Sequence, residues 1–514
     1  MNNSTNCKYH QPSKRFVFLL ALGVTAGCQS FDDRLATRNQ TSIQDPTESV
    51  DASLHAPVSA NNCEIAQVGF NELVTPSTSQ LVWASPLEID GTEGVIDTAH
   101  GTSLADAASF RSMTLNDFEA IAFANNPTIQ QLEATTRKAA GFRTQVGLRP
   151  NPVVGYQAMQ LADAGTDQHV AFLSQTFVTA DKLELNRRVL NEALRAQLFQ
   201  LEAQKYRIST DIRVKFYDAL AAQRRMRLIE DFQSVADRGL EIAEELKSAK
   251  EGSQLEVVQA KVQKNEVDLA LRNASIRFEA VWRELVALTG SPEMLPVSLD
   301  GELPQAETSL DWSSVASSIV SSSPEYQAAR ARVSQARANI TRQDVQAVPN
   351  IDLQFGAGVD NATDSGMINL QVSAPIPVFN KNQGNMSAAR AELSRACMEV
   401  RRIENSIKAR LAEVSQAYDS SLASVSMYAE EILPNAAEGL KLAETAYKSG
   451  ETSFLQVLVA RRTYFDTNLQ YIVAQAQLAQ ARARVDGYVL TGALDPIIDN
   501  SGDDSLRGLT LSQQ

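Results

Sequence analysis

Histidine, cysteine and acidic side chains are the groups of this chain that could perform catalysis or hold a metal ion. Neither histidine nor cysteine stands at the spacing of a zinc site, so we expect no high-affinity metal site. Gly356-Ala357-Gly358 does not continue as a dinucleotide-binding loop, and we find neither a phosphate-binding loop nor a nucleophile elbow. The sequence therefore predicts no catalytic residue and no cofactor, and the chain is not expected to be an enzyme. The four histidines are His10, His55, His100 and His169.

The composition narrows the possible partners. The 514 residues are 44% apolar and 21% charged, with a formal net charge of −14. An acidic chain without clustered Lys and Arg binds nucleic acid poorly, because neutralising phosphates requires grouped cations. We therefore exclude nucleic acid as a partner.

The N-terminus has the pattern of a secretory signal peptide, residues 1–28. Two basic residues precede a short apolar run that ends at Gly27-Cys28, and the run is too short to span a bilayer as a helix. Thr25-Ala26-Gly27-Cys28 resembles a bacterial lipobox, which implies a lipid on Cys28; an ordinary cleaved signal with an incidental cysteine is the alternative. Of the other cysteines, Cys63 falls in a linker and Cys397 in a helix, so no structural disulfide framework is indicated.

Two repeats fill the middle of the chain, residues 113–300 and 301–492, between a polar linker (29–112) and a polar tail (493–514). The repeats are offset by about 200 residues. Arg149-Pro150-Asn151-Pro152 recurs as Val348-Pro349-Asn350-Ile351, Lys182 recurs as Lys381, and Gly252 as Gly450. Each half predicts a helix, a strand pair, a very long helix, a glycine turn and a returning helix.

The strand pairs carry the membrane prediction. Residues 351–359 and 368–374 alternate apolar and polar side chains for about nine residues, as a tilted membrane strand requires. The polar residues Asp352 and Gln354 are expected to face a lumen. The first-half pair, 153–161 and 169–177, is less regular, and a half-buried soluble hairpin would give the same alternation.

The helices favour a tube. Residues 182–250 and 381–449 each predict one helix of roughly 100 Å, bent at Pro434 in the second case. The helices at about 115–147 and 253–290 together match that length, so they could stack end to end beside it. A coiled-coil seam is predicted by the alternating spacing of three and four of Leu411, Val414, Tyr418, Ser421, Val425, Tyr428 and Ile432.

Four strands cannot close a barrel, and open sheet edges are not tolerated in hydrocarbon. Two copies would give eight strands, whose interior side chains fill the barrel, whereas three copies give twelve and leave a channel. The expected fold is mainly α with a small β part: a trimeric α-barrel of coiled-coil hairpins continued by a 12-stranded transmembrane β-barrel, with four strands from each chain. A soluble coiled-coil protein with a small β cap is the alternative.

Residues 115–492 resemble the TolC-type outer-membrane efflux proteins. The similar stretches are 148–153, 173–177, 447–450 and Pro375-Ile376-Pro377-Val378-Phe379-Asn380-Lys381-Asn382-Gln383-Gly384-Asn385. The last stretch looks most like the CzcC-like branch, which serves heavy-metal efflux. The resemblance implies a homotrimer in the bacterial outer membrane and its lipid, with a long periplasmic extension. It also implies docking onto a periplasmic adaptor (membrane fusion protein) and an inner-membrane pump of the RND (resistance–nodulation–division) type.

The resemblance places the hairpin turns at the periplasmic tip, with adaptor contacts at Gly252, Ser253, Gly450, Thr452 and Ser453. A glycine in each turn would permit the positive φ that ends a long helix. Glu256 would bond Tyr447 or Lys448 of the neighbouring hairpin and latch the tip shut; a solvated helix carboxylate is the alternative.

The predicted function is a passive exit duct of a tripartite efflux system, with heavy-metal cations as one cargo. Two alternatives stay open: an exit duct for type I protein secretion, and a non-conducting spacer or adhesin. The sequence names neither the exported substrate nor the partner pump.

Overall fold

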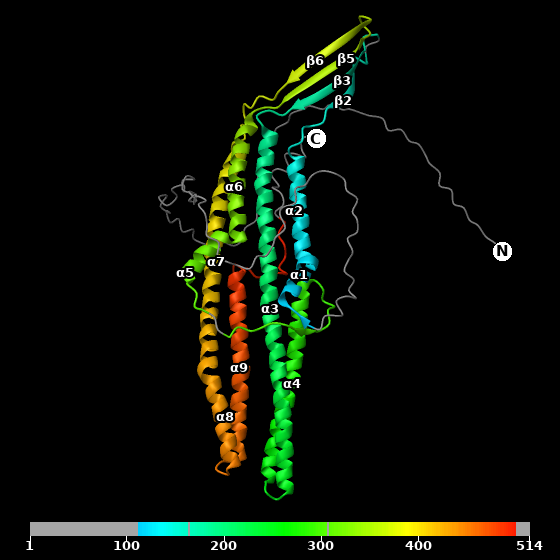
Figure 1. Cartoon of the computed structure of the whole chain (residues 1–514). Coiled ribbons are helices and arrows are strands. Elements are labelled where there is room, and N and C mark those ends of the chain that lie inside the picture. Colours follow the sequence, from blue (N-terminus) through cyan, green and yellow to red (C-terminus); the bar gives the residue numbers. More distant parts are fainter. Residues whose placement is uncertain (1–111, 163–164, 306–307, 500–514) are drawn as a thin grey trace, which may run out of the picture. The chain divides into compact units, whose positions relative to one another are not determined.

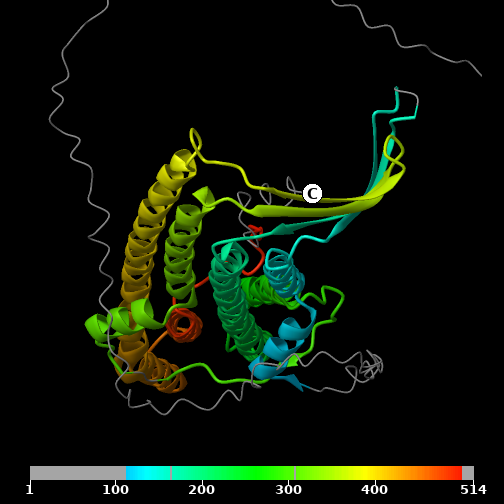
Figure 2. The ribbon, with the colours of Figure 1, turned by 90° about the horizontal axis from the view of Figure 1, so that it is seen from above.

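The computed structural model describes residues 112–162, 165–305 and 308–499, all within the compact unit Ala60–Gln514. Four antiparallel strands form one sheet in the order β2-β3-β5-β6. Their bounds are β2 Val153–Met159, β3 Gln168–Phe177, β5 Ile351–Asp360 and β6 Ser365–Ser373. The two predicted strand pairs therefore join edge to edge inside one chain, and Figure 2 shows the resulting curved layer.

Two very long helical segments run from the sheet to the hairpin turns (Figure 1). The first is α3, Lys182–Ser248, a single helix of 67 residues. The second consists of α7 (Gln383–Met427), a π-helical turn (Tyr428–Ile432) and α8 (Leu433–Lys448). The π turn precedes Pro434, which stands in the first turn of α8 and lacks the N–H that an α-helix would use.

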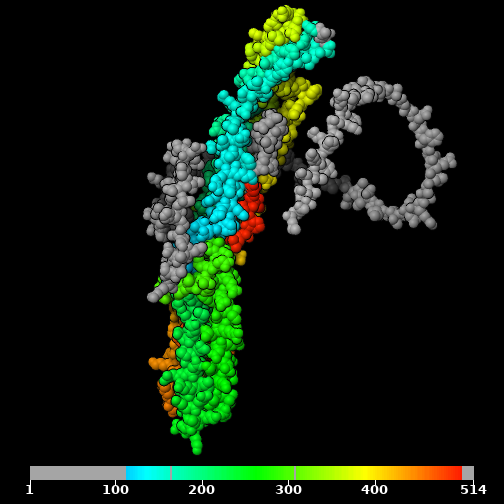
Figure 3. Space-filling model, turned by 90° about the vertical axis from the view of Figure 1, so that its right-hand side faces the viewer, coloured from blue at the N-terminus to red at the C-terminus, as the bar shows by residue number. Residues whose placement is uncertain are grey.

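The returning helices are α4 (Gln254–Thr289) and α9 (Phe454–Asp486). Helices α2 (Pro127–Gln145) and α4 both pack along α3, and α6 (Pro324–Asp344) and α9 both pack along α7. Figure 3 shows α2 and α4 following one another on one side of the molecule. Two short helices thus accompany one long helix in each repeat, as the lengths predict.

The helix expected at 115–147 is broken in the structure. It consists of α1 (Leu115–Asn125) and α2, and the second repeat divides in the same way into α5 (Trp312–Ser322) and α6. Pro127 cannot continue the ladder of α1, and the Asn126 side chain instead caps α2 by accepting from the Thr128 N–H at 2.9 Å. A 3₁₀ turn, Val345–Ala347, ends the α6 segment, and short strands β1 (Ser112–Met113) and β4 (Ser298–Leu299) pair in parallel.

The predicted coiled-coil seam on α7 is buried at Leu411, Val414, Tyr418, Ser421 and Val425. Tyr428, the first residue of the π turn, is half-buried and still packs against the cluster that contains Tyr418 and Val425, whereas Ile432 at the end of the turn is 37% exposed. The extra residue of a π turn shifts the side chains that follow it around the helix axis, so the seam prediction is wrong at Ile432.

One expectation about the cysteines is wrong. Cys397 on α7 is disulfide-bonded, and the chain's other three cysteines lie outside the described residues. The predicted lipid-bearing Cys28, the signal peptide and the linker up to residue 111 also lie outside them.

Candidate functional site

The sheet has one strongly apolar face. Val154, Leu173, Phe355 and Leu370 share this face through the strand register, and each side chain is at least 49% exposed. A contiguous exposed apolar face of this kind is what a strand presents to lipid.

The opposite face carries the predicted lumen residues. Asp352 lies on it, and its Oδ1 accepts a hydrogen bond from Thr176 Oγ1 at 2.6 Å. Gln354 is on the same face, between Ser174 and Gln371. The middle of this face is less polar than the sequence suggests, because Val170 is only 2% exposed and lies over Gly356.

The junction between sheet and helices is tied by a buried lysine. Lys182, at the start of α3, is 7% exposed, and its Nζ donates to the Val348 carbonyl and, at 2.8 Å, to Asn350 Oδ1. Thr179 Oγ1 donates to the Pro349 carbonyl at 2.6 Å. Burial lowers the pKa of the Lys182 ammonium, so its hydrogen bonds must offset desolvation. We call these contacts the Lys182 clamp; they join the end of β3 to the start of β5.

The two hairpin turns have the same geometry at the far end of the molecule. In each, an N–H reaches back to a carbonyl of the last helical turn: Glu251 to Leu246 at 2.9 Å, and Glu451 to Ala446 at 2.8 Å. The residue with positive φ is Lys250 (φ 63) in the first turn and Gly450 (φ 77) in the second.

The prediction that Gly252 supplies the positive φ is therefore wrong. Gly252 is needed for a different reason: a Cβ there would lie 2.9 Å from the Cβ of Leu246. The structural equivalents in the turns are Lys250 with Gly450, and Ser253 with Ser453, which precede α4 and α9 respectively.

The predicted latch residues gather at these turns. Glu256 is half of a capping box: its Oε2 accepts from the Ser253 N–H at 2.8 Å, while Ser253 Oγ accepts from the Glu256 N–H. Burial and the nearby Glu256 carboxylate raise the pKa of Tyr447. Lys448 and Ser453 are exposed, as an adaptor-contact residue must be, whereas Thr452 is half-buried.

The two turns are held together within the chain. Phe454, at the start of α9, packs against the buried cluster of Ala243, Val257 and Ala260 on α3 and α4. Further along, the rings of Phe232 and Phe465 stack with their centroids 4.3 Å apart. Glu256 and Tyr447 thus belong to one tip formed by both hairpins.

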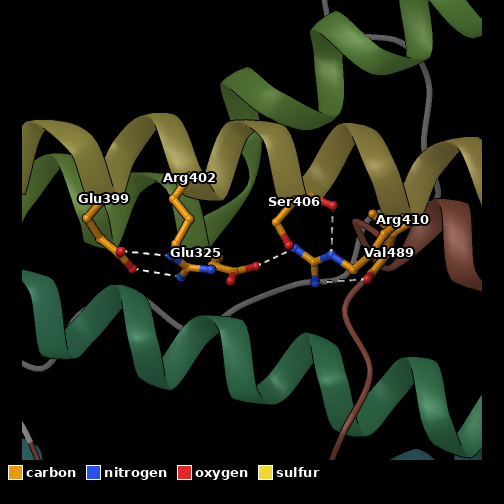
Figure 4. A network of polar contacts seen from close by, with 6 residues as sticks. All are labelled: Glu325, Glu399, Arg402, Ser406, Arg410 and Val489. Carbon is orange, nitrogen blue, oxygen red and sulfur yellow. Dashed lines mark hydrogen bonds and ion pairs between the residues drawn. The ribbon is translucent and has the colours of Figure 1, made fainter. Parts of the chain in front are cut away.

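A buried polar connection midway along the helices was not predicted. Residues 487–493, which we call the terminal clasp, follow α9, and Asp211 Oδ2 accepts from the Gly492 and Ala493 N–H groups at 3.0 and 2.8 Å. On the other side, Arg410 Nη1 donates to the Val489 carbonyl at 3.3 Å and Nη2 pairs with Glu325 at 2.7 Å (Figure 4). The clasp therefore joins α3 of the first repeat to α6 and α7 of the second.

Within the described residues, no set of three or more His, Cys, Asp or Glu side chains could hold a metal ion. No helix among them is both long and apolar enough to cross a bilayer.

The sheet and paired hairpins, taken with the comparisons, define the class of protein. Residues 315–489 match the family model described as outer membrane efflux protein, and the fold is similar to the solved structure of CusC, with a TM-score of 0.61 over 74% of this chain and 92% of that chain at 17% identity. The chain is therefore similar to the outer membrane efflux proteins, in sequence over residues 315–489 and in fold over most of its length. It resides in the bacterial outer membrane, with its helices extending into the periplasm.

Two relatives sharpen the identification. The chain is 24% identical over 361 residues to the cobalt-zinc-cadmium resistance protein CzcC of Cupriavidus metallidurans, covering 70% of this chain and 80% of CzcC. It is 25% identical over 421 residues to the pyoverdine export outer membrane protein OpmQ of Pseudomonas putida, covering 75% and 87%. These family and fold neighbours are channel proteins rather than enzymes.

Proposed function

We propose that three copies of this chain form a passive exit duct, with a 12-stranded barrel continued by a tunnel of twelve helices. The duct works with a periplasmic adaptor and an inner-membrane RND-type pump, which supplies the energy. Its cargo is heavy-metal cations, a proposal supported by the similarity to CzcC.

The observation that carries the proposal is the pair of bare sheet edges. Among the residues that the structure describes, β2 pairs only with β3 and β6 only with β5, so both outer strands present unpaired backbone N–H and C=O groups there. Each unpaired backbone group costs roughly several kcal/mol in hydrocarbon. The sheet edges must therefore pair with the edges of other copies. Three copies is the smallest number that leaves a channel.

An exposed stripe on α4 supports side-by-side copies in the periplasm as well. Four apolar side chains recur every seventh residue, and each is at least 52% exposed: Leu255, Val262, Leu269 and Ile276. A heptad stripe is the pattern that a helix presents to a partner helix. Helix α8 buries no residue in the single chain, so it too has a face that a neighbouring copy could cover.

The lumen and the tip follow from this assembly. Asp352 and Gln354 of each copy would face the channel near the junction and favour cations weakly. Gly252, Ser253, Gly450, Thr452 and Ser453 would meet the adaptor at the tip. The electrostatic effect of the Glu256 carboxylate, which helps to raise the pKa of Tyr447, supports the latch, with the Lys448 ammonium as a second partner.

The test is native mass spectrometry of the detergent-extracted protein together with conductance across a planar bilayer. We expect a trimer that conducts, and loss of the Glu256 carboxylate in Glu256→Ala should raise the conductance by unlatching the tip. A monomer, or a trimer without conductance, would overturn the duct, the latter in favour of a spacer or adhesin. Unchanged conductance of Glu256→Ala would remove only the latch.

Two finer points need their own measurements. The mass of the mature N-terminus decides whether Cys28 carries lipid. The inner-membrane protein that co-purifies decides the system: an RND pump supports metal efflux, whereas an ATP-driven pump would indicate type I secretion.

A further inference from the structure

We infer that Lys381 of one copy binds the Asn151 side chain and the Arg149 carbonyl of the next copy, sealing the junction between subunits as the Lys182 clamp seals it within the chain. The inference rests on the proposed oligomer, because neither group has this partner in a single chain. It assigns Lys381 and Asn151, which the family comparisons leave without a role, to a defined contact.

The Lys182 clamp joins residues of the two repeats. Lys182, Val348 and Asn350 make the clamp between β3 and β5, which come from different repeats. Each has a counterpart 199 residues away, Lys381, Arg149 and Asn151. Lys381 stands between the end of β6 and the start of α7, and Arg149 and Asn151 come just before β2; β6 and β2 are the two outer strands of the described sheet.

A junction between copies would have a defined strand register. The β2–β3 and β5–β6 pairings obey the same offset, since Val153 pairs with Ser174 and Asp352 with Ser373. We shift the β3–β5 pairing by the same 199 residues, so that β6 replaces β3 and β2 of the next copy replaces β5. This places Val372 opposite Tyr156 of the next copy and Ser373 opposite Gly155. The strand register puts Val372 and Tyr156 on the lipid-facing side of their strands, so the faces agree.

The segment that follows β6 is exposed in the single chain. Ile376 is 83% exposed and Phe379 92%, and Lys381 is exposed without a side-chain ion pair or hydrogen bond in the described part of the chain. In the first repeat the equivalent lysine is buried. The second-repeat junction therefore resembles a clamp whose other half is missing.

The differences between the repeats fit the same scheme. In the chain, Thr179 satisfies the Pro349 carbonyl, but its counterpart is Val378, which cannot donate. The equivalent carbonyl, that of Pro150, already accepts from Gln175 Nε2 at 2.9 Å. Pro375 and Pro377 also lack the N–H needed to extend the ladder here. The lysine and asparagine are the polar pair that remains to hold the two copies.

The experiment uses zero-length carbodiimide coupling, which joins an ammonium to a carboxylate only in direct contact and leaves the Cys397 disulfide untouched. Asn151→Asp in the detergent-extracted full chain provides the carboxylate. We expect a ladder of covalent dimers and trimers above the wild-type background, with a linked peptide that joins residues 151 and 381. Adding Lys381→Gln should abolish both. As the matched control, Asn350→Asp should couple to Lys182 within one chain and add no ladder.

The outcomes separate this inference from the proposed function. A trimer by native mass spectrometry without the Lys381-dependent ladder would overturn the clamp and leave the duct intact. A ladder that survives Lys381→Gln would also overturn it. A monomer would overturn the proposed function, and the clamp with it.

Discussion

Replacing Asp211 by alanine should loosen the terminal clasp by a predictable amount. The Asp211 carboxylate accepts two backbone N–H groups, those of Gly492 and Ala493, in a segment whose residues Val489, Leu490 and Ala493 are at most 2% exposed. Leaving a buried donor unpaired costs about 1–3 kcal/mol. For the two donors together we take about 3 kcal/mol, which corresponds to roughly a hundredfold change in the opening equilibrium.

The assay is amide hydrogen exchange of the peptides covering 487–495 in the assembled protein. Asp211→Ala should exchange about a hundredfold faster there. Asp211→Asn keeps an acceptor oxygen of the same shape, and its exchange should stay near the wild-type rate. Equal rates for Asp211→Ala and wild type would refute the acceptor role, and equally fast exchange in Asp211→Asn would show that the charge, rather than the acceptor, matters.

The same pair of variants has a pH signature. Burial raises the pKa of the Asp211 carboxyl, against the lowering effect of the two N–H groups. The stability that this group contributes is therefore full below the unfolded pKa, about 4, and falls as the pH rises through the higher folded pKa. Asp211→Asn should flatten the pH dependence of clasp exchange in that window.

Three further predictions concern the tip and the core. Gly450→Ala should destabilise the second turn by about 1 kcal/mol, whereas Lys250→Gly should slow cleavage of the first turn in limited proteolysis, because both positions have positive φ. Phe465→Ala should cost about 3–4 kcal/mol through its lost stack on Phe232 and lower the thermal midpoint; an unchanged midpoint would contradict the packing. Burial raises the pKa of Tyr206 to about 12, so its stabilising contribution persists up to pH 10 and is lost as the pH rises towards 12; absorbance titration of wild type against Tyr206→Phe should show one late-ionising phenol.

The sequence predicts best the elements whose signal is local. The alternation in residues 351–359 places β5 within one residue of its observed end at Asp360. The absence of breakers after Lys182 likewise sets the extent of α3, which ends two residues before the predicted Lys250. Both signals are periodicities of neighbouring residues, and the tertiary structure does not override them.

The conformation of the hairpin turns is harder to predict, because residue type is a weak guide to backbone conformation there. Matching Gly252 to Gly450 misaligned the repeats by two residues, since Lys250 adopts the left-handed conformation without being a glycine. What selects the position is the bond from Glu251 to Leu246, which closes the helix end. That bond depends on the backbone and leaves no mark in the sequence.

The terminal clasp and the disulfide at Cys397 were beyond sequence reasoning. Asp211 meets Gly492 across 281 residues of chain. In the sequence, the half-buried Asp211 cannot be distinguished from any other helix carboxylate. The one available signal was the recurrence of Thr289-Gly290 as Thr491-Gly492. The first pair ends α4, but the second lies beyond the end of α9 at Asp486, and the recurrence names no partner.

The π turn at Tyr428–Ile432 sets the rotation of the following helix, α8, about its axis. One additional residue rotates the following helix by about 100° about its axis. The Glu444 carboxylate reaches Arg461 of α9 at 2.8 Å only in that phase. Shortening the turn by one residue would rotate Glu444 more than a quarter of a revolution away from Arg461. The direction of the second hairpin towards its turn therefore depends on this one irregularity of the backbone.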